Sequence, residues 1–280
     1  MNATEFMVRG RRFVRGERTV VMGILNVTPD SFSGDGRLSP SDAIERAAAQ
    51  YAAGADIIDI GGESTRPGHV QIPIAEEIER VVPVIRAVRE RFADWPISID
   101  TYKPEVARAA LAAGADCINS IWGASDELIA LAVESGATLA IMHNREKIYE
   151  GEIVEEVLRA LGADARRARE RGVPAERIVL DPGIGFGKTP DQNIAVLAGL
   201  ERLVALGYPT LLGTSRKSTL GKLAGRVRPD DRIFATAATT ALAVRAGIDI
   251  VRVHDVAATR DVVAVSDAIV RNWRPLHWTE

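Results

Sequence analysis

Apolar and polar residues occur along this chain in blocks rather than in strict alternation. Short apolar runs recur, and most follow an alanine-rich stretch that ends at a glycine, a residue suited to the left-handed position after a helix. The runs lack the period-two alternation of half-exposed strands, which indicates parallel strands covered on both faces. Eight strands are predicted, at residues 20–27, 56–61, 96–100, 116–121, 138–143, 178–182, 210–215 and 249–254.

A helical pattern follows each predicted strand. The helices are expected at about residues 40–53, 74–92, 104–113, 126–135, 152–171, 192–206, 230–245 and 258–272. Eight βα units in unbroken succession predict an α/β fold of the closed (β/α)₈, or TIM, barrel type. The alternative is an open doubly wound sheet, which usually has fewer strands and a switch point in their order.

The start of the chain and its composition exclude several classes of protein. Residues 1–19 are predicted to form a short hairpin that turns near Gly10 and closes the lower end of the barrel, and no linker divides residues 1–280, so we expect a single domain. The net charge of -3 argues against nucleic-acid binding, and no apolar run is long enough to span a membrane. One cysteine, Cys117, fits a reducing compartment and is expected in the core. We therefore predict a cytoplasmic protein whose partners are small molecules.

The stretch IVLDPGIGFGK, at residues 178–188, shows what a strand end carries in this chain. An apolar run ends in Asp181, and three glycines follow at alternate positions. Glycines permit positive φ angles and close backbone approach, so we expect a loop that lies against a ligand. The spacing fits neither a P-loop nor a dinucleotide-binding loop. Lys188 is therefore expected at the surface or at the approach to the next helix.

All eight predicted strands end in polar or ionisable residues. One such residue often caps a helix or fixes a turn, but eight are hard to explain in this way. In a barrel of this type the carboxyl ends of the strands form the functional face. The residues are Asn26, Asp59 with Glu63, Asp100, Asn119, His143, Asp181, Ser215 to Lys217, and Arg252 with His254. For His143 a role in packing or behind the site is favoured.

The first group of these residues accepts hydrogen bonds. Asp100, Asn119 and Asp181 end the third, fourth and sixth predicted strands. Such a set suits a flat heterocycle that presents several N–H donors. A carboxylate in a buried position needs partners of this kind, because an unpaired buried charge is costly.

The second group is cationic. Lys217, Arg252 and His254 belong to the last two strands, where barrels commonly bind phosphate, and Arg66 could join them from a loop. Asn26 offers a neutral oxygen to a hard cation such as Mg²⁺, which keeps most of its waters when it bridges phosphates. The predicted ligand is therefore a donor-rich ring attached to a phosphate or pyrophosphate.

Two loops at the predicted functional face are rich in Gly, Ser, Thr and Pro. They are NVTPDSFSGDG, at residues 26–36, and GGESTRPG, at residues 61–68. Loops in this position carry function more often than packing, and closing over a site is one such function. Both are candidates for mobile lids.

Six motifs in order resemble the dihydropteroate synthase family. They are GILNVTPDSFS at residues 23–33, IIDIGGESTRPG at 57–68, SIDTYKPEV at 98–106, LDPGIGFGK at 180–188, SRKS at 215–218 and RVHD at 252–255. The resemblance implies an enzyme that joins 4-aminobenzoate to 6-hydroxymethyl-7,8-dihydropterin pyrophosphate, forming 7,8-dihydropteroate and pyrophosphate. It also implies a dissociative mechanism in which pyrophosphate leaves first, Mg²⁺ as the cofactor, and a homodimer.

The resemblance also implies a role for individual residues. The pterin would contact Asp100, Asn119, Asp181, Lys217 and Arg252. Pyrophosphate would contact Asn26, Arg66, Arg252 and His254, with the metal at Asn26. Aminobenzoate would contact Thr65, Arg66, Pro67, Gly185, Phe186, Lys217 and Ser218, a pocket that predicts sensitivity to sulfonamides. The catalytic candidates are Lys217, Arg252, His254 and Asp100.

Two other functions remain open on the sequence alone. A pterin-dependent methyltransferase would share the pterin-binding acids but has no use for the STRPG loop or the SRKS and RVHD motifs. A non-catalytic pterin-binding paralogue is the second alternative, and the intact loops favour catalysis over it. One departure from the family pattern is Gly34-Asp35-Gly36 in place of Asp-Gly-Gly, which displaces the acid of that loop by one position.

Overall fold

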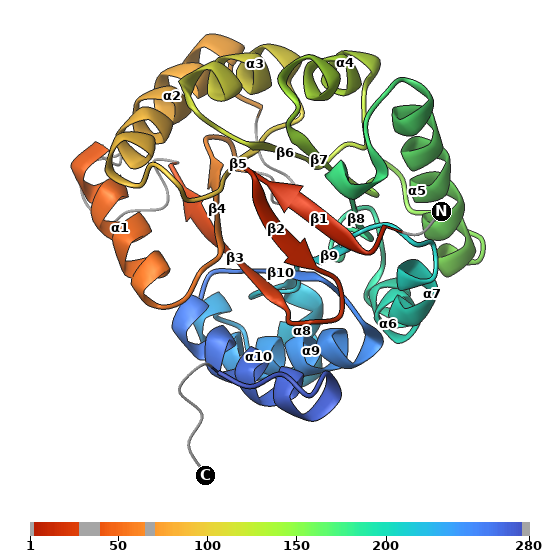
Figure 1. The fold of residues 1–280 in the computed structure, drawn as a ribbon. Coiled ribbons are helices and arrows are strands. Elements are labelled where there is room, and N and C mark those ends of the chain that lie inside the picture. The colour runs from red at the N-terminus through yellow and green to blue at the C-terminus, as the bar shows by residue number, and fades with distance from the viewer. Residues whose placement is uncertain (1–2, 28–39, 65–70, 276–280) are drawn as a thin grey trace.

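The computed structural model describes residues 3–27, 40–64 and 71–275, except for the side chain of residue 40. Eight parallel strands form one sheet, in the order β8-β7-β6-β5-β4-β3-β10-β9. A bridge between Leu180 and Thr210, and a hydrogen bond from Leu180 N to Pro209 O (2.9 Å), bring the two edge strands together. Figure 1 looks along the resulting barrel, with the helices in a ring around it. The predicted α/β barrel is confirmed.

The strands lie within the apolar runs. They are β3 (Val20–Asn26), β4 (Ile57–Gly61), β5 (Ile97–Asp100), β6 (Cys117–Ser120), β7 (Thr138–Met142), β8 (Ile178–Asp181), β9 (Leu211–Leu212) and β10 (Ile250–Val253). β9 is shorter than the predicted strand at 210–215, because the chain leaves the ladder after Leu212 and turns toward Lys217. Nearly every strand residue is buried, as parallel strands inside a helical ring require.

The helices agree with the prediction except in the last third of the chain. They are α1 (Pro40–Ala52), α2 (Ile74–Arg91), α3 (Pro104–Ala113), α4 (Asp126–Ser135), α5 (Ile153–Glu170), α6 (Pro190–Ala198), α7 (Leu200–Val204), α8 (Ser218–Ala224), α9 (Ile233–Ala246) and α10 (Val256–Val270). The single helix expected at 192–206 is divided at Gly199, whose N–H bonds to the carbonyls of Ala195 and Val196. Helix α8 has no counterpart in the prediction, because it is short and contains Gly221.

The predicted N-terminal hairpin is present and closes one end of the barrel. Strands β1 (Glu5–Val8) and β2 (Arg11–Val14) pair in antiparallel fashion around Arg9 and Gly10, both with positive φ. The rings of Phe6 and Phe13 stack with their centroids 4.9 Å apart. These rings pack on the inner side chains of the barrel strands, so the hairpin seals the hydrophobic interior. Figure 1 shows the hairpin lying across the barrel mouth.

Three acidic residues just before strands brace the same end of the barrel. Each lies two residues after the glycine that follows a helix, and each accepts a hydrogen bond from a main-chain N–H of the neighbouring strand segment. The pairs are Val21 N with Asp56 (3.0 Å), Ile97 N with Asp116 (2.9 Å) and Thr210 N with Asp249 (2.9 Å). An arginine side chain also forms an ion pair with each of the three acids. Polar residues at this end of such barrels stabilise the fold rather than take part in catalysis.

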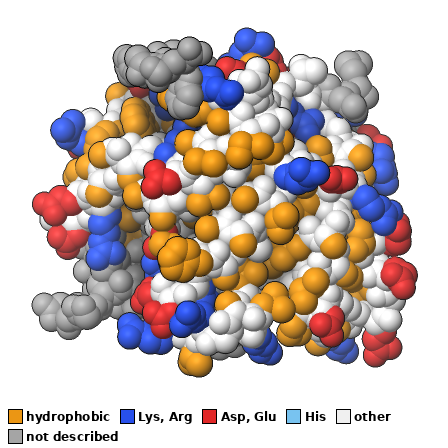
Figure 2. Space-filling view, turned by 90° about the horizontal axis from the view of Figure 1, so that it is seen from below, with side chains coloured by type: hydrophobic (Ala, Val, Ile, Leu, Met, Phe, Trp, Pro, Cys, Tyr) orange, Lys and Arg blue, Asp and Glu red, His pale blue; other side chains and the backbone are white. Residues whose placement is uncertain are grey.

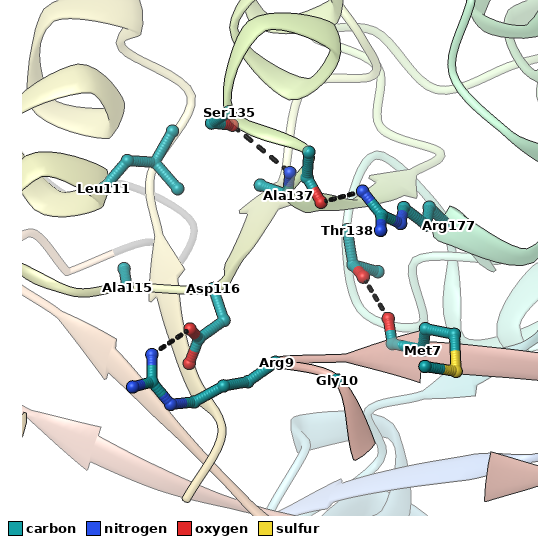
Figure 3. Close-up of a pocket in the computed structure, with 11 residues that line it drawn as sticks. Met7, Arg9, Gly10, Leu111, Ala115, Asp116, Ser135, Ala137, Thr138 and Arg177 are labelled. Atoms are coloured by element: carbon teal, nitrogen blue, oxygen red, sulfur yellow. Dashed lines mark hydrogen bonds and ion pairs between the residues drawn. The ribbon is translucent and has the colours of Figure 1, made fainter. Parts of the chain in front are cut away.

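A cavity of about 280 Å³ lies between the hairpin and the adjacent strand starts. Figure 3 shows Arg9 and Arg177 on opposite sides of it, with Arg9 bound to Asp116 and Thr138 bound to the carbonyl of Met7. Its lining comes from the hairpin, from the carboxyl ends of α3 and α4, and from the residues that lead into the next strands. It therefore lies at the opposite end of the barrel from the polar residues that the sequence singles out.

Cys117 lies in β6 and is buried, with 2% of its surface exposed. Burial disfavours the thiolate and raises the pKa of this thiol to about 12, so it is chemically quiet. Its predicted place in the core is confirmed. In the part of the chain that the structure describes, no helix is both long enough and apolar enough to cross a membrane.

Candidate active site at the carboxyl ends of the strands

Arg252 is the centre of the polar cluster at the carboxyl ends of the strands. It follows Val251 in β10, and its guanidinium bridges two acids from other strands. Nε lies 2.6 Å from Asp59 Oδ2 in β4, and Nη2 lies 2.6 Å from Asp100 Oδ2 at the end of β5. Asp59 is fully buried and Asp100 is 5% exposed, so these ion pairs are largely shielded from water.

Asn119 joins the same network from β6. In the ladder Asn119 lies opposite Asp100, and its Nδ2 donates to Asp59 Oδ2 at 3.0 Å. This bond orients the amide and uses one of its two N–H donors, so the side-chain oxygen points away from Asp59 as a candidate acceptor for a ligand. Asp100 Oδ1 is buried and has no hydrogen-bond partner among the described residues. An acceptor of this kind is costly unless a donor reaches it.

Asp181, in β8, is separated from Asn119, in β6, by strand β7. The register pairs Asp181 with Met142 in β7, and β7 in turn separates it from β6, so Asp181 and Asn119 are not neighbours in the sheet. One oxygen, Oδ1, accepts from Gly183 N at 2.7 Å. A Cβ at Gly213 would lie 4.0 Å from both Arg252 Cβ and Asp181 Oδ2, so the missing side chain keeps space between these two groups.

Lys217 and Phe186 approach each other from two different loops. The Lys217 ammonium lies 3.9 Å from the centroid of the Phe186 ring, a cation–π contact. A Cβ at Gly185 would lie 3.1 Å from Lys217 Cδ, and Gly185 itself has φ +83°. Glycine therefore allows this loop to pack closely against the lysine side chain. Ser218 follows Lys217 as the first residue of α8 and is exposed.

His254 lies beyond the end of β10, next to the β9–α8 loop. Ser215 Oγ accepts from His254 N at 3.1 Å and lies 3.0 Å from the ring nitrogen Nδ1. Arg216 has a positive φ of 60° and forms a two-pronged ion pair with Asp255. Together these contacts fix the SRKS segment against the RVHD segment, which places Lys217 and His254 at the same face of the barrel.

Asn26 ends β3 and is half-buried. Its neighbour across the ladder is Gly61, where an added Cβ would lie 3.7 Å from Asn26 Oδ1 and 3.6 Å from Asp100 Oδ2. The absence of a side chain at Gly61 therefore keeps a small space open between these two oxygens.

Comparison with known proteins decides the family. The family model "Pterin binding enzyme" matches residues 22–254. A dihydropteroate synthase from Clostridium beijerinckii is 46% identical over 268 residues, covering 94% of this chain and 99% of its own. The chain belongs to the pterin-binding enzymes. Within them it is an enzyme of the dihydropteroate synthase type.

Solved structures agree with this assignment. A dihydropteroate synthase from Clostridium difficile, solved with pteroic acid, has a TM-score of 0.89 and 47% identity, covering 92% of this chain and 99% of its own. A second one, from Xanthomonas albilineans with 4-aminobenzoic acid, also has a TM-score of 0.89, at 39% identity, covering 95% and 98%. The Xanthomonas enzyme has also been solved with 7,8-dihydropteroate.

Several predicted site residues of this pterin-binding enzyme lie outside the described part of the chain. Thr65, Arg66 and Pro67 belong to residues 65–70. Asp35, the displaced loop acid to which no site role is assigned, belongs to residues 28–39. Most of the two candidate lid loops falls in the same two segments. The roles of these residues stay predictions.

Lys188 differs from the expectation of a surface lysine. It does directly precede the first residue of the α6 capping box, Thr189, as a residue at the approach to a helix would. Its side chain is nevertheless buried, 9% exposed, and its ammonium lies 2.9 Å from Nδ1 of His143. Burial, rather than exposure, is possible because main-chain carbonyls surround the ammonium.

The loop glycines also differ from the expectation that they face a ligand. A Cβ at Gly183 would lie 2.0 Å from His143 O, and one at Gly187 would lie 2.3 Å from Arg145 O. Two of the three glycines thus allow close approach to the segment that follows β7. Of the three, Gly185 is the one that approaches Lys217.

A second buried ion cluster lies beside the site. Lys103 Nζ lies 2.7 Å from Glu63 Oε2 and 2.7 Å from Glu77 Oε2, and it donates to Ile72 O at 2.8 Å. Ile72 N donates to Glu63 at 2.9 Å. The cluster therefore joins the residues on either side of 65–70. The sequence drew attention to Glu63 only as a strand-end acid.

The pKa values of two buried carboxyl groups, Asp100 and Asp181, lead to a prediction of how activity depends on pH. Burial raises the pKa of Asp181 to about 6 and that of Asp100 to about 7, with Arg252 opposing the shift at Asp100. If Asp100 and Asp181 bind a pterin ring, as the sequence predicts, each would accept a hydrogen bond from a ring N–H better when ionised, so binding of the pterin should weaken as the pH falls through these values.

We expect kcat/KM for the pterin pyrophosphate to rise between about pH 5 and 7 and to level off above about pH 7.5, because this parameter reports the ionisation of the free enzyme. The D181N variant should lose the lower of the two inflections in the pH profile, the one near pH 6 that Asp181 causes. The measurement is a pH–rate profile in a constant-ionic-strength buffer. A profile that is flat from about pH 5 to 8 would contradict the assignment.

Proposed function

We propose that this protein condenses 4-aminobenzoate with 6-hydroxymethyl-7,8-dihydropterin pyrophosphate to give 7,8-dihydropteroate and pyrophosphate. The observation that carries the proposal is the pairing of Arg252 in β10 with Asp59 in β4 and with Asp100 at the carboxyl end of β5. This network presents buried acceptors and one cation at the same place. Relatives named dihydropteroate synthase, solved with 4-aminobenzoic acid and with 7,8-dihydropteroate, support one substrate and the product.

We assign the pterin ring to Asp100, Asn119 and Asp181, with Lys217 and Arg252 beside it. The buried and unpartnered Asp100 Oδ1 supports this assignment, since a donor on the ring edge would satisfy it. Asn119 Nδ2 is held by Asp59, which directs the amide oxygen to act as the acceptor for a ligand. Burial raises the pKa of Asp181, and the charge of Lys217 at the same face of the barrel partly opposes this rise.

The mechanism we propose is dissociative. The C–O bond between the pterin methylene and pyrophosphate breaks first, and both electrons leave with pyrophosphate. The carboxylates of Asp100 and Asp181 stabilise the cation that develops on the pterin, while Arg252 and His254 stabilise the leaving pyrophosphate. The amine of aminobenzoate then attacks the methylene, and the proton that it loses goes to solvent or to the released pyrophosphate. No protein nucleophile is required.

Mg²⁺ fits the residues at the end of β3. Asn26 Oδ1 is a neutral oxygen next to the space left by Gly61, and a hard cation prefers oxygen ligands of this kind. Among the described residues, no group of three or more His, Cys, Asp or Glu side chains gathers to hold a metal. We propose that Asn26 would supply one ligand to Mg²⁺, which would neutralise charge on the pyrophosphate.

We assign aminobenzoate to Gly185, Phe186, Lys217 and Ser218, together with Thr65, Arg66 and Pro67 from outside the described residues. The contact between Lys217 and the Phe186 ring supports an apolar wall beside a cation, which suits an aromatic carboxylate. Sulfonamides resemble aminobenzoate in shape. We propose that they compete for the same pocket.

The test is pyrophosphate release from the purified protein with the pterin pyrophosphate, Mg²⁺ and varied aminobenzoate. The proposal expects release that depends on aminobenzoate and is inhibited competitively by a sulfonamide. Binding of the pterin without release would indicate a non-catalytic pterin-binding paralogue. Methyl transfer from a reduced pterin in place of release would indicate a methyltransferase.

We also propose that the protein is a homodimer through α9 and α10. These helices pack side by side and leave large apolar side chains exposed: Phe234 (86%), Leu242 (61%), Val265 (61%) and Ile269 (79%). Figure 2 shows this side of the molecule, with apolar side chains across its middle and charged ones mostly around it. A patch of this kind is typical of a protein–protein interface.

The L242E/I269E variant should therefore be monomeric, because two carboxylates on each side of the interface would be buried without partners. Light scattering should give twice the chain mass of 30.2 kDa for the wild type and 30.2 kDa for the variant. The V133E variant, at a 43% exposed position on α4, is the matched control and should remain dimeric. A monomeric wild type at micromolar concentration would contradict the proposal.

We propose a cytoplasmic location as well. The support is that the one cysteine of the chain, Cys117, is buried and does not need an oxidising compartment for any structural role.

A further inference from the structure

A buried lysine lies directly behind the loop that carries Gly185 and Phe186. Lys188 Nζ donates to Gly183 O at 2.9 Å and to Phe186 O at 3.1 Å, and it lies 3.3 Å from His143 O. The ammonium thus holds both ends of the turn from Gly183 to Phe186, and it joins this turn to the end of β7. Nothing in the condensation mechanism uses this side chain.

His143 supplies the fourth contact. Its Nδ1 lies 2.9 Å from Lys188 Nζ, and with the lysine donating, Nδ1 is the acceptor and the ring proton is on Nε2. Burial and the neighbouring cations Lys188 and Arg145 lower the pKa of His143 to about 3, so the ring is neutral near pH 7. The neutral ring therefore offers an acceptor, and not a cation, to Lys188 Nζ, whose own pKa burial lowers to about 7.

The loop depends on these contacts because it has few others that fix its shape. Gly183, Gly185 and Gly187 all have positive φ angles, between 55° and 83°, and a chain with three such residues gains much conformational freedom when it is released. Besides the contacts of Lys188, one turn hydrogen bond lies inside the loop, from Phe186 N to Gly183 O at 3.2 Å. Two more tie the loop to its surroundings: Gly183 N donates to Asp181 at 2.7 Å and Gly185 N donates to Asn193 at 2.7 Å.

The contacts of Lys188 affect the candidate site through Phe186 and Lys217. The Phe186 carbonyl is held by Lys188, and the Phe186 ring is the surface on which the Lys217 ammonium lies, 3.9 Å from its centroid. A displacement of the Phe186 main chain would move the ring away from Lys217. Asp181 lies in the β8 ladder and touches the turn through one hydrogen bond, from Gly183 N to its Oδ1 (2.7 Å), whereas the hydrogen bonds of Lys188 go to His143, Gly183 and Phe186.

We propose that Lys188 is a positioning residue that, with His143, fixes the Gly183–Gly187 turn so that Phe186 forms the wall of the aromatic-amine subsite. The proposal rests on the proposed function, because it assigns that subsite to Phe186 and Lys217. It predicts an effect on the second substrate and little effect on the pterin. A merely structural lysine would instead affect both substrates, or stability alone.

The experiment compares K188M with the wild type and with K147M, a matched change at an exposed lysine in the segment after β7. We expect the KM for aminobenzoate to rise at least tenfold in K188M, with the KM for the pterin pyrophosphate changed less than threefold. Amide hydrogen exchange in a peptide that covers residues 183–188 should become at least tenfold faster. K147M should match the wild type in all three measurements.

A pair of changes at His143 keeps the proposal testable if K188M does not fold. H143N places an amide oxygen near the position of Nδ1 and should retain a low KM for aminobenzoate. H143L removes the acceptor and should reproduce the raised KM and the faster exchange. Equal KM values in H143N and H143L would overturn the proposal.

The outcomes separate this inference from the proposed function. A wild-type protein that releases no pyrophosphate in the presence of aminobenzoate refutes the proposed function. The amide hydrogen-exchange measurement still tests whether Lys188 positions the turn. If the wild type is active and K188M has an unchanged KM for aminobenzoate and unchanged amide exchange, the positioning role of Lys188 alone is refuted. A parallel rise of both KM values would also overturn it, because the lysine would then support the fold and not the subsite.

Discussion

The K217A variant is expected to lose at least about 10³-fold in kcat/KM, because removing one preorganised electrostatic group from an active site typically costs 10²- to 10³-fold and Lys217 serves two ligands in our assignment. Its ammonium lies on the Phe186 ring, and its charge acts on Asp181 and Asp100. Without it, the pterin site loses a cation and the aminobenzoate site loses the cation that lies beside its Phe186 wall. The measurement is steady-state pyrophosphate release with each substrate varied in turn.

The matched control is K222A, which removes an exposed lysine from the last turn of the same short helix, α8. It should retain activity within twofold. Both variants should have the far-UV circular dichroism of the wild type, since neither side chain is part of the hydrophobic core. Turnover of K217A within tenfold of the wild type would show that Lys217 is not at the reacting centre.

The R252M variant should lose both activity and stability. Arg252 is the shared partner of Asp59 and Asp100, and without it Asp59, which is fully buried, keeps a charge with no cation beside it. Removing one partner of a buried pair costs about 3–5 kcal/mol in unfolding free energy. Product formation should fall below detection, because the same side chain is assigned to both the pterin and the pyrophosphate. Urea unfolding and pyrophosphate release measure the two effects.

The double variant D59N/R252M separates these effects. The D59N change keeps an acceptor for the Asn119 amide but removes the stranded charge, so about 1–3 kcal/mol of unfolding free energy should return relative to R252M. Activity should not return, because the cation is still missing. A double variant as unstable as R252M would show that the charge on Asp59 is not what Arg252 compensates.

The sequence predicted most of the fold because the strands of a parallel barrel are buried on both sides. Runs such as the one in β4 are wholly apolar apart from Asp59, and the glycines after the helices adopt the left-handed conformation expected of them, as Gly114 and Gly247 do. Helix α8 was missed because seven residues that include a glycine give too short a helical pattern. The close approach of Gly221 to Arg226 O, which depends on tertiary packing, explains why glycine is present there.

The candidate site was predicted less completely than the fold. Strand-end position identified Asp100, Asn119 and Arg252, and the structure brings these three together. It could not show that Asp59 would hold both Arg252 and Asn119, because a contact between β4, β6 and β10 is not local in sequence. Lys188 was misjudged for the same reason: the carbonyls and the histidine that bury it become neighbours only when β7 and β8 pair.

The central claim is that the cluster around Arg252 builds dihydropteroate from two substrates. The most direct measurement is mass-spectrometric quantification of 7,8-dihydropteroate, made alongside pyrophosphate, from purified protein with both substrates and Mg²⁺. We predict equal amounts of the two products, formed only when aminobenzoate is present, and none from R252M. Pyrophosphate without dihydropteroate, or dihydropteroate from R252M at the wild-type rate, would contradict the account.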